Sequence, residues 1–410
     1  MKPHIAILCL AAPLLYAQEP GKVVKKSPIA LLPNGSVLQR VLLPRYDAQR
    51  RLVGDLRTET MTLIDGDRVQ GENVLIRFYN PDRSLSGKVE LTRALFDQAK
   101  SSLFAKEDVK LTRDRLTATG GGLVYSFESG KGFLLGPVST RLSPPPPATS
   151  MNTSPFALPA IALLAFAPAI LPAAPPAFVT PEELAEIKAD AESAKPAIDA
   201  ANQSASSELS ADREAAARAT EAATAFMRKN DINTIAVDGN TEDEAKPLEV
   251  EPGSGDTVIN CDGGMYFDAD EGVLVYLKNV RVTDPRFNLD GADELKIFFD
   301  KKPVGKKAET GESAGPTANF GDVKKLIATG AVKILQKSVG GKEPVEASGG
   351  LLTYNIKSGE IIISERFPWV KQGTFYARAK EPNLTLRLLN DGSFSTQGNW
   401  EMGGNLNFNR

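Results

Sequence analysis

Histidine and cysteine are almost absent from this sequence. Its 410 residues include one histidine, His4, and two cysteines, Cys9 and Cys261. Removal of residues 1–17 as a secretory signal would leave a chain with no histidine and a single thiol. That composition excludes an intramolecular disulfide, a Ser-His-Asp triad, a Cys-His dyad and any metal site that contains histidine. Catalysis by paired carboxylates needs no histidine, but no pattern in the sequence points to it.

The N-terminal segment has the pattern of a secretory signal peptide. Lys2 supplies a positive start, an apolar run follows from Ile5 to Ala17, and the bond from Ala17 to Gln18 suits cleavage. The run is too short to span a membrane comfortably, although an uncleaved N-terminal anchor stays open. We therefore expect an exported, periplasmic protein.

Neither charge sign dominates the sequence. Lys and Arg number 48, Asp and Glu number 51, and the formal net charge is −3. No global positive field would steer the chain to nucleic acid, so we expect no nucleic-acid partner. The acidic cluster of Asp268, Asp270 and Glu271 could suggest calcium, but it lacks the spaced ligands and distal Glu of an EF-hand loop. A hairpin turn is favoured there, and we expect neither a metal nor a cofactor.

A stretch without charge interrupts the chain from Pro155 to Val179. A transmembrane helix is one interpretation, but the longest proline-free piece, 160–167, would span only about 12 Å as a helix. Because the hydrocarbon of a bilayer is roughly 30 Å thick, we favour a semi-rigid Pro/Ala-rich linker over 143–180. A second signal sequence beginning at Met151 also stays open, as does association of 155–179 with the membrane.

The segment at 181–230 is rich in Ala, Glu, Ser and Lys. Thr180 can cap a helix that has Pro181 in its first turn, and a second helix is predicted from Ser210 to Lys229. The apolar residues of this second helix are mostly alanine. We therefore expect a spacer, or a helix on the surface, that buries little.

Two regions, 31–142 and 250–405, have the pattern of all-β domains. Short apolar runs alternate with polar residues, as in NVLIRFY at 73–79, and Gly, Asp, Asn and Ser separate the runs at short intervals. The sequence thus predicts two all-β domains joined by the linker and the helical spacer.

The two regions share short phrases. TATGGGLVYSFESGKGFL at 117–134 aligns without a gap on EASGGLLTYNIKSGEIII at 346–363. ALFDQAKSSLFAKEDVKL at 94–111 aligns on MYFDADEGVLVYLKNVRV at 265–282, and ATGAVKI at 328–334 repeats its end. A strand-and-turn unit that recurs in this way indicates stacked sheet layers.

The order of these phrases resembles the LptA/OstA-like and LptC-like periplasmic proteins of lipopolysaccharide transport. YFDADEGVLVYLKNVRV, LDGADELKIFFD, IATGAVKI and ASGGLLTYNIKSGEIIIS follow one another as that family's repeats do, over most of 255–400. The first region is similar, more loosely, to the opening of an LptC-type domain through LPRYDAQRRLVGDLRTETMTLIDGDRVQGENVLIRFY. The family's Gly-Asn-Val is replaced at 107–109, 278–280 and 330–332, and two such domains in one chain are unusual.

The resemblance implies two β-jellyrolls, each an open pair of sheets whose apolar interior holds acyl chains. It implies a non-enzymatic role in carrying lipopolysaccharide across the periplasm to the outer membrane. The implied partners are lipid A acyl chains and other lipopolysaccharide-transport jellyroll proteins, joined by edge-strand pairing. An apolar groove would shield lipid from water at roughly 0.8 kcal/mol per buried methylene.

Alternation along the strands selects the side chains that would face the interior. In the repeated phrase, Gly349-Gly350 would turn the chain into a strand and Ser358-Gly359 would let it leave. Thr353 and Arg387 are predicted to face away from the interior. The first copy contributes Leu123, Tyr125 and Phe127 to the inward face. The residues predicted to line a lipid-binding groove are Val280, Val282, Ile297, Leu352, Tyr354, Ile356, Leu384, Leu386 and Leu388.

Two other functions remain open at this point. Apolar strand faces usually just pack, so an exported structural or adhesive β-sandwich without a lipid ligand is the alternative. A carbohydrate-active enzyme with two carboxylates ranks third.

Overall fold

The computed structural model describes residues 33–46, 49–80, 82–113, 115–144, 207–232, 253, 255–301, 320–338 and 341–404. The expected signal peptide, and most of the expected linker, lie outside the described residues. The part that is described contains 22 antiparallel strands and one helix, at 207–229. No described helix has the length and apolar character needed to cross a membrane.

Ten strands precede the helix in the chain. They are β1 Val37–Tyr46, β2 Leu52–Leu63, β3 Arg68–Tyr79, β4 Leu85–Asp97, β5 Ser102–Ala105, β6 Val109–Arg113, β7 Leu116–Gly120, β8 Gly122–Ser126, β9 Lys131–Leu135 and β10 Val138–Leu142.

Twelve strands follow the helix. They are β11 Thr257–Cys261, β12 Gly264–Asp268, β13 Val273–Thr283, β14 Phe287–Lys301, β15 Phe320–Gln336, β16 Val345–Asn355, β17 Glu360–Ser364, β18 Trp369–Gln372, β19 Phe375–Ala379, β20 Thr385–Leu388, β21 Phe394–Gln397 and β22 Trp400–Gly403.

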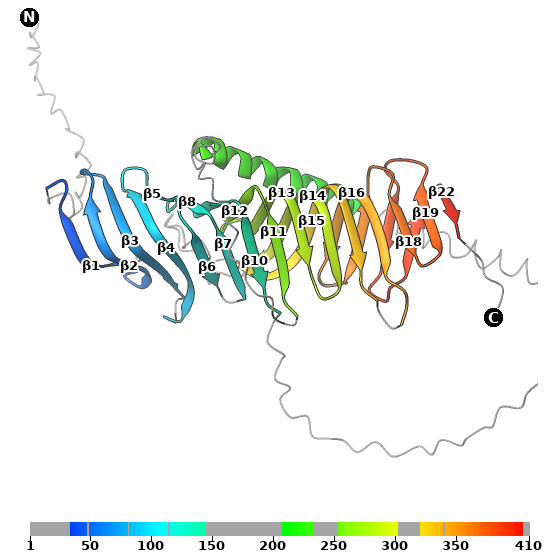
Figure 1. The fold of residues 1–410 in the computed structure, drawn as a ribbon, viewed down its shortest axis with the longest axis horizontal. Helices are drawn as coiled ribbons and strands as arrows, with labels where there is room; N and C mark the ends of the chain where they lie inside the picture. The colour runs from blue at the N-terminus through cyan, green and yellow to red at the C-terminus, as the bar shows by residue number, and fades with distance from the viewer. Residues whose placement is uncertain are drawn as a thin grey trace, which may run out of the picture.

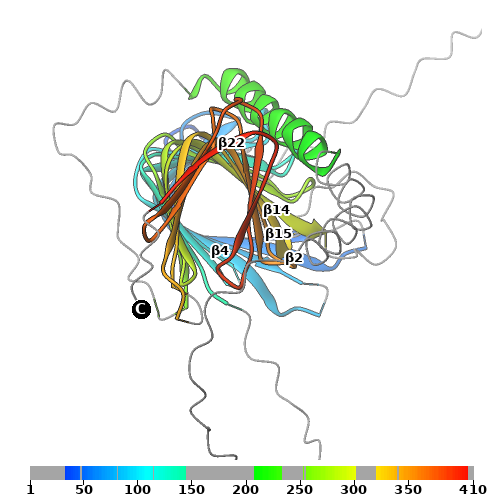
Figure 2. The same cartoon turned by 90° about the vertical axis from the view of Figure 1, so that its right-hand side faces the viewer.

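The strands form one sheet that is folded into two facing walls. Wall A contains β5, β8, β9, β12, β17, β20 and β21, and wall B contains β6, β7, β10, β11, β18, β19 and β22. The long strands β1 to β4 and β13 to β16 bend and give one half to each wall. For example, β16 pairs with β17 through 351–355 and with β18 through 345–348. The fold is therefore an all-β jellyroll, seen end-on in Figure 2.

Two lines run along the length of this jellyroll. Along one line, which we call the spine, the chain passes between the walls, as at 120–122 and 261–264. Along the opposite line, which we call the mouth, hairpin turns end the strands of both walls. The turn of Asp268 to Val273 is one of them: the amides of Asp270 and Glu271 donate to Asp268, and Gly272 has a positive φ. The acidic cluster is thus a hairpin turn, as predicted.

The two regions expected as separate β domains adjoin within the same sheet. Strand β10 pairs with β11, and β9 pairs with β12, so the strands before and after the helix are hydrogen-bonded neighbours. Figure 1 shows the strands following one another along a single elongated body. One apolar cluster continues through it, from Met61 of β2 to Leu388 of β20.

The glycine pair of the repeated phrase lies inside a strand, which corrects the prediction that it leads into one. Gly349 and Gly350 are central in β16, at the spine, where the inward residues change from Ala347 to Leu352. A Cβ on Gly349 would lie 2.5 Å from Cγ2 of Ile363 and 2.8 Å from the carbonyl oxygen of Ser364. Glycine is needed here because the bend brings β16 close to β17.

The helix at 207–229 lies along the outer face of wall A (Figures 1 and 2). Its residues Ala223 and Phe226 pack in one cluster with Phe133 of β9, Tyr266 of β12 and Val275 of β13. The helix thus bridges the junction between the two halves of the sheet. The structure corrects the expectation of a helix that buries little: small alanines let its axis approach the sheet closely.

Candidate functional site

The interior between the walls is the candidate site, because it is apolar along the whole jellyroll. Each strand presents every second side chain to the space between the walls, so the two walls together enclose one continuous cluster. Bends at the spine, such as the one at Gly291 in β14, shift which residues alternate inward. The cluster therefore continues along each long strand, although different residue parities face inward before and after the bend.

Seven of the nine predicted lining residues are buried members of this cluster. None of the seven is more than 2% exposed. They are Val280, Val282, Ile297, Leu352, Tyr354, Leu386 and Leu388. Ile356 is partly buried and packs against the cluster from the turn after β16. Val280 and Val282 belong to wall B, and Leu386 and Leu388 belong to wall A, so both walls contribute to the cluster.

Two placements differ from the prediction. Leu384 precedes β20 and is not part of the cluster; instead, a Cβ on Gly398 would meet its side chain at 2.5 Å. Thr353 faces the outer side of wall A, as predicted, but it is buried there. Arg387, also on that side, is one-third exposed and pairs with Glu360. Arg387 is therefore a better example than Thr353 of a residue that faces outward and is exposed.

The first copy of the repeated phrase lines the same interior. Leu123 and Tyr125 are buried in the cluster and Phe127 packs against it. The rings of Tyr125 and Phe127 meet edge to face at 4.9 Å, and Tyr125 stacks on Phe267 at 6.1 Å. Burial raises the pKa of Tyr125 well above its usual value, so its hydroxyl stays neutral inside the jellyroll. Tyr125 and Phe267 also join the two halves of the sheet.

Several aromatic lining residues were not singled out from the sequence. Phe267, Tyr276 and Phe287 are buried in the cluster, and the ring of Phe287 meets that of Tyr354 at 5.2 Å. Phe267 and Tyr276 share the inward face because the hairpin of β12 and β13 pairs Phe267 with Leu274, and alternation along either strand alone does not show this. Phe287 required the hairpin from β13 to β14 to be known, because only that turn brings it opposite Tyr354.

Polar side chains end the apolar interior at the mouth of wall B. Asp284 and Gln336 follow inward-facing residues of β13 and β15 and are themselves buried. Burial disfavours the charge of Asp284, but hydrogen bonds from Arg286 and Thr257 outweigh it and hold the pKa of Asp284 below its usual value. Asp284 therefore remains charged at neutral pH beside the apolar lining.

Side-chain contacts connect the two walls across the mouth. Among the described residues, no strand of wall A pairs with a strand of wall B along this line. Arg115 forms an ion pair with Asp322, and Arg286 lies 5.2 Å from the ring centroid of Tyr354. Lys342 pairs with Asp391 at 3.2 Å. Gln336 donates to the carbonyl of Leu389 at 2.9 Å, and Gln372 donates to that of Gly392 at 3.1 Å. We call this row of contacts the seam.

The carboxylate of Asp391, in the seam, is stabilised in its charged form. Hydrogen bonds from the side chain and amide of Ser393, and then from Lys342, lower the pKa of Asp391 to about 2. Its contact with Lys342 therefore persists in mild acid. High salt, which screens exposed charges, is the condition that would weaken this contact.

The lining offers hydrocarbon and aromatic rings, which suit an apolar ligand. Among the described residues, no group of three or more Cys, His, Asp or Glu side chains could hold a metal. Cys261 is buried in the interior, and burial raises the pKa of its thiol despite hydrogen bonds that oppose the shift.

No protein-family model matches the chain, and no curated protein matches it either. A similar solved structure is LptH of Pseudomonas aeruginosa, described as the LptA-homologous periplasmic component of the lipopolysaccharide transport device. The two chains are 15% identical with a TM-score of 0.27, and the match covers 36% of this chain and 93% of that one. Most of the present chain therefore lies outside the match.

Proposed function

We propose that this protein is a non-enzymatic lipid carrier of the periplasm, which holds the acyl chains of lipopolysaccharide between its two walls on the way to the outer membrane. The observation that carries the proposal is the apolar cluster that runs unbroken from β2 to β20 between the walls. A long interior of this kind suits several extended hydrocarbon chains. The order of the sequence phrases supports the same function.

The driving force would be the burial of acyl methylenes, at roughly 0.8 kcal/mol each. An acyl chain would take up contacts that the two walls make with each other in the described structure. The loss of wall-to-wall contacts offsets part of the gain, so binding is expected to be reversible. Reversible binding is what transfer from one carrier to the next requires.

Transfer between carriers would use the free edges of the sheet. Strand β1 pairs with β2 alone, which leaves its other edge without a strand among the described residues. Val37, Leu42 and Tyr46 of β1 are exposed. An edge with apolar side chains is a template for another strand, so we propose other lipopolysaccharide-transport jellyroll proteins as partners there.

One observation favours a second candidate, an exported structural β-sandwich without a lipid ligand. The walls pack against each other so closely that Val280, Ile297 and Leu386 are fully buried. Such packing is what an ordinary sandwich core also shows.

Mass spectrometry separates the two candidates. The protein is purified from a periplasmic extract without detergent, and bound lipid is identified in the intact complex and after extraction. The carrier predicts retained lipid with several acyl chains, which added lipopolysaccharide exchanges. A chain that carries no lipid and binds no added lipopolysaccharide would support the sandwich instead.

A further inference from the structure

The C-terminal end, the spine and the mouth of the jellyroll differ as routes into the interior. At the C-terminal end, Phe375 of β19 on wall B meets Phe394 of β21 on wall A with ring centroids 5.6 Å apart. Both rings, with Trp400 of β22, pack against the apolar cluster. Aromatic side chains from both walls therefore obstruct this end.

The spine is closed by the chain itself. Each passage between the walls is covalent, and neighbouring passages are hydrogen-bonded, as where the amide of Gly350 donates to the carbonyl of Glu365. The close approach at Gly349 leaves no room even for a Cβ. At Gly349 the spine therefore leaves no room for a ligand, and we take the spine as the hinge between the walls.

The mouth differs because, among the described residues, it is crossed by side chains alone. The seam contacts, Arg115 with Asp322 and Lys342 with Asp391 among them, join partly exposed groups that water can replace. Arg115 and Asp322 are 207 residues apart in the sequence; Arg115 stands between β6 and β7 of wall B, and Asp322 stands near the start of β15. Their separation would part the walls without breaking the pairing of any strand.

We propose that the mouth is the entry for the ligand: an acyl chain enters sideways when the seam between wall A and wall B opens, with the spine as hinge. This inference rests on the proposed function, which supplies the acyl ligand. It assigns the seam, rather than the aromatic C-terminal end of the jellyroll, as the gate.

A removable link across the mouth tests the proposal. The full chain carries Cys9→Ser, Arg115→Cys and Asp322→Cys, and a short bis-methanethiosulfonate linker joins the two new thiols. Cys261 is buried and should not react. The matched control carries Arg213→Cys and Glu365→Cys, which joins the helix to the spine outside the interior, where an ion pair of 2.6 Å now stands. Loading of a fluorescent long-chain fatty acid is timed with the linker in place and after reduction.

Sideways entry predicts that the link across the mouth slows loading at least about tenfold, which corresponds to about 1.4 kcal/mol in the barrier. Reduction should restore the rate, and the control link should leave it unchanged. Equal rates in the linked and reduced forms would overturn the gate while leaving the carrier function in place. No loading in any form would overturn the carrier function and the gate together.

A second variant does not depend on the linker. Asp322→Ala removes one seam contact, and Asp290→Ala removes an exposed carboxylate from the outer side of wall B as a control. The seam variant should load faster by about two- to fivefold, equivalent to about 0.4–1 kcal/mol, and with less dependence on salt. Rates equal to those of the control would count against the gate.

Discussion

The two walls share one interior but differ on their outer faces. On wall A, the outward residues Tyr266, Val273 and Val275 are apolar and lie beneath the helix. On wall B, outward positions such as Lys333 and Arg281 are charged and exposed. Both walls have the same alternation on their inner faces. The difference between their outer faces arises because wall A lies between the helix and wall B, whereas the outer face of wall B is in contact with water.

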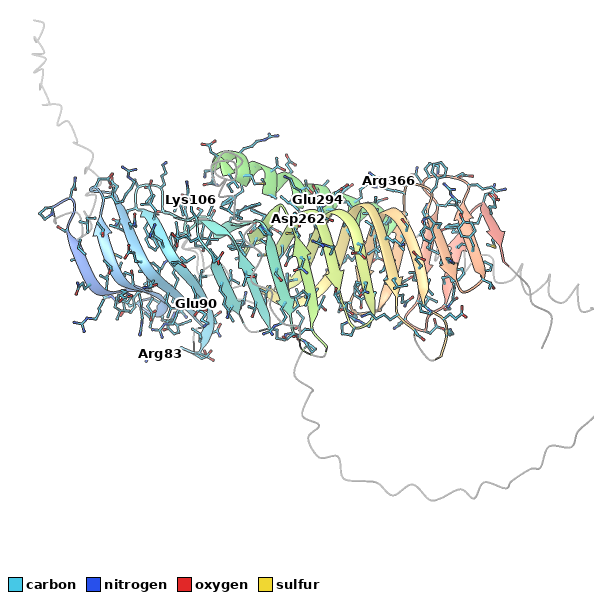
Figure 3. The ribbon with its side chains drawn as sticks, in the orientation of Figure 1. Arg83, Glu90, Lys106, Asp262, Glu294 and Arg366 are labelled. Atoms are coloured by element: carbon cyan, nitrogen blue, oxygen red, sulfur yellow. The ribbon has the colours of Figure 1, made fainter. Side chains whose placement is uncertain are left out.

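The contacts under the helix are not only apolar. Lys325 of β15 pairs with Asp212 and Glu208 of the helix at 2.7 and 3.1 Å, and Thr220 donates to Glu294 of β14 at 2.7 Å. Figure 3 shows Glu294 on the side of the sheet that the helix covers. These polar contacts fix the position of the helix along the wall, which an alanine-rich face alone would leave free to slide.

The largest expected effect tests whether the helix is part of the fold. Phe226→Ala removes a ring that packs on Tyr266 with centroids 5.7 Å apart. It should lower the free energy of unfolding by about 2–4 kcal/mol. Tyr376→Ala, at an exposed ring on the outer side of wall B, should change it by no more than about 0.5 kcal/mol. Urea unfolding followed by tryptophan fluorescence measures both, and equal small losses would mean that the helix is dispensable.

A smaller effect is expected from the charges on the two walls. Lys325→Met leaves Asp212 buried without its cation and should cost about 1–3 kcal/mol. Lys333→Met, which removes an exposed pair with Glu346 on wall B, should cost less than about 0.5 kcal/mol. If Lys333→Met lowered the free energy of unfolding as much as Lys325→Met does, charges on the exposed wall B would matter as much as charges beneath the helix on wall A.

The pH dependence of the Lys325 effect has a definite sign. Burial lowers the pKa of Lys325, but hydrogen bonds to Asp212 and Glu208 outweigh it, so the pKa lies above the ordinary 10.5. A raised pKa means that the stabilisation is fully present below pH 10.5 and is lost as the pH rises through the folded value. The difference in unfolding free energy between wild type and Lys325→Met should therefore be constant at neutral pH and shrink only in strong alkali. A difference that grew with pH would contradict the assigned pairing.

The smallest effect should be the same on both walls. Arg213 of the helix pairs with Glu365 of the spine beside wall A, and Arg281 of wall B pairs with Asp262 of the spine. All four side chains are at least one-third exposed. Arg213→Ala and Arg281→Ala should each cost less than about 1 kcal/mol, because exposed ion pairs contribute little. A loss of unfolding free energy several times larger for Arg213→Ala would show that ion pairs, more than apolar contacts, hold the helix on the sheet.

Much of the interior could be predicted from the sequence because strands alternate regularly. Leu352, Tyr354 and Leu386 were assigned inward on that pattern alone, and they are buried in the shared cluster. Alternation failed where a bend or a turn intervenes: Leu384 stands before its strand begins, and Gly349-Gly350 shift the inward face within β16.

The helix was predicted at 210–229, but its burial against wall A and the seam were not, for different reasons. The runs GGMYF and GVLVYL are apolar on both faces, which is typical of a strand covered on both sides, so the buried outer face of wall A had a sequence signal. The seam had none. Arg115 and Asp322 meet only because many strands of fixed register lie between them, and no local pattern encodes that register.

The central claim is that the interior, and not the outer surface, contacts acyl chains. A diazirine analogue of leucine placed at Leu386 faces the interior, and the same residue at Arg387, its neighbour in β20, faces outward. After incubation with lipopolysaccharide and irradiation, the carrier predicts covalent capture of lipid at 386 and none at 387, in proteins whose circular dichroism matches wild type. Equal capture at both positions, or no capture at 386, would contradict the account.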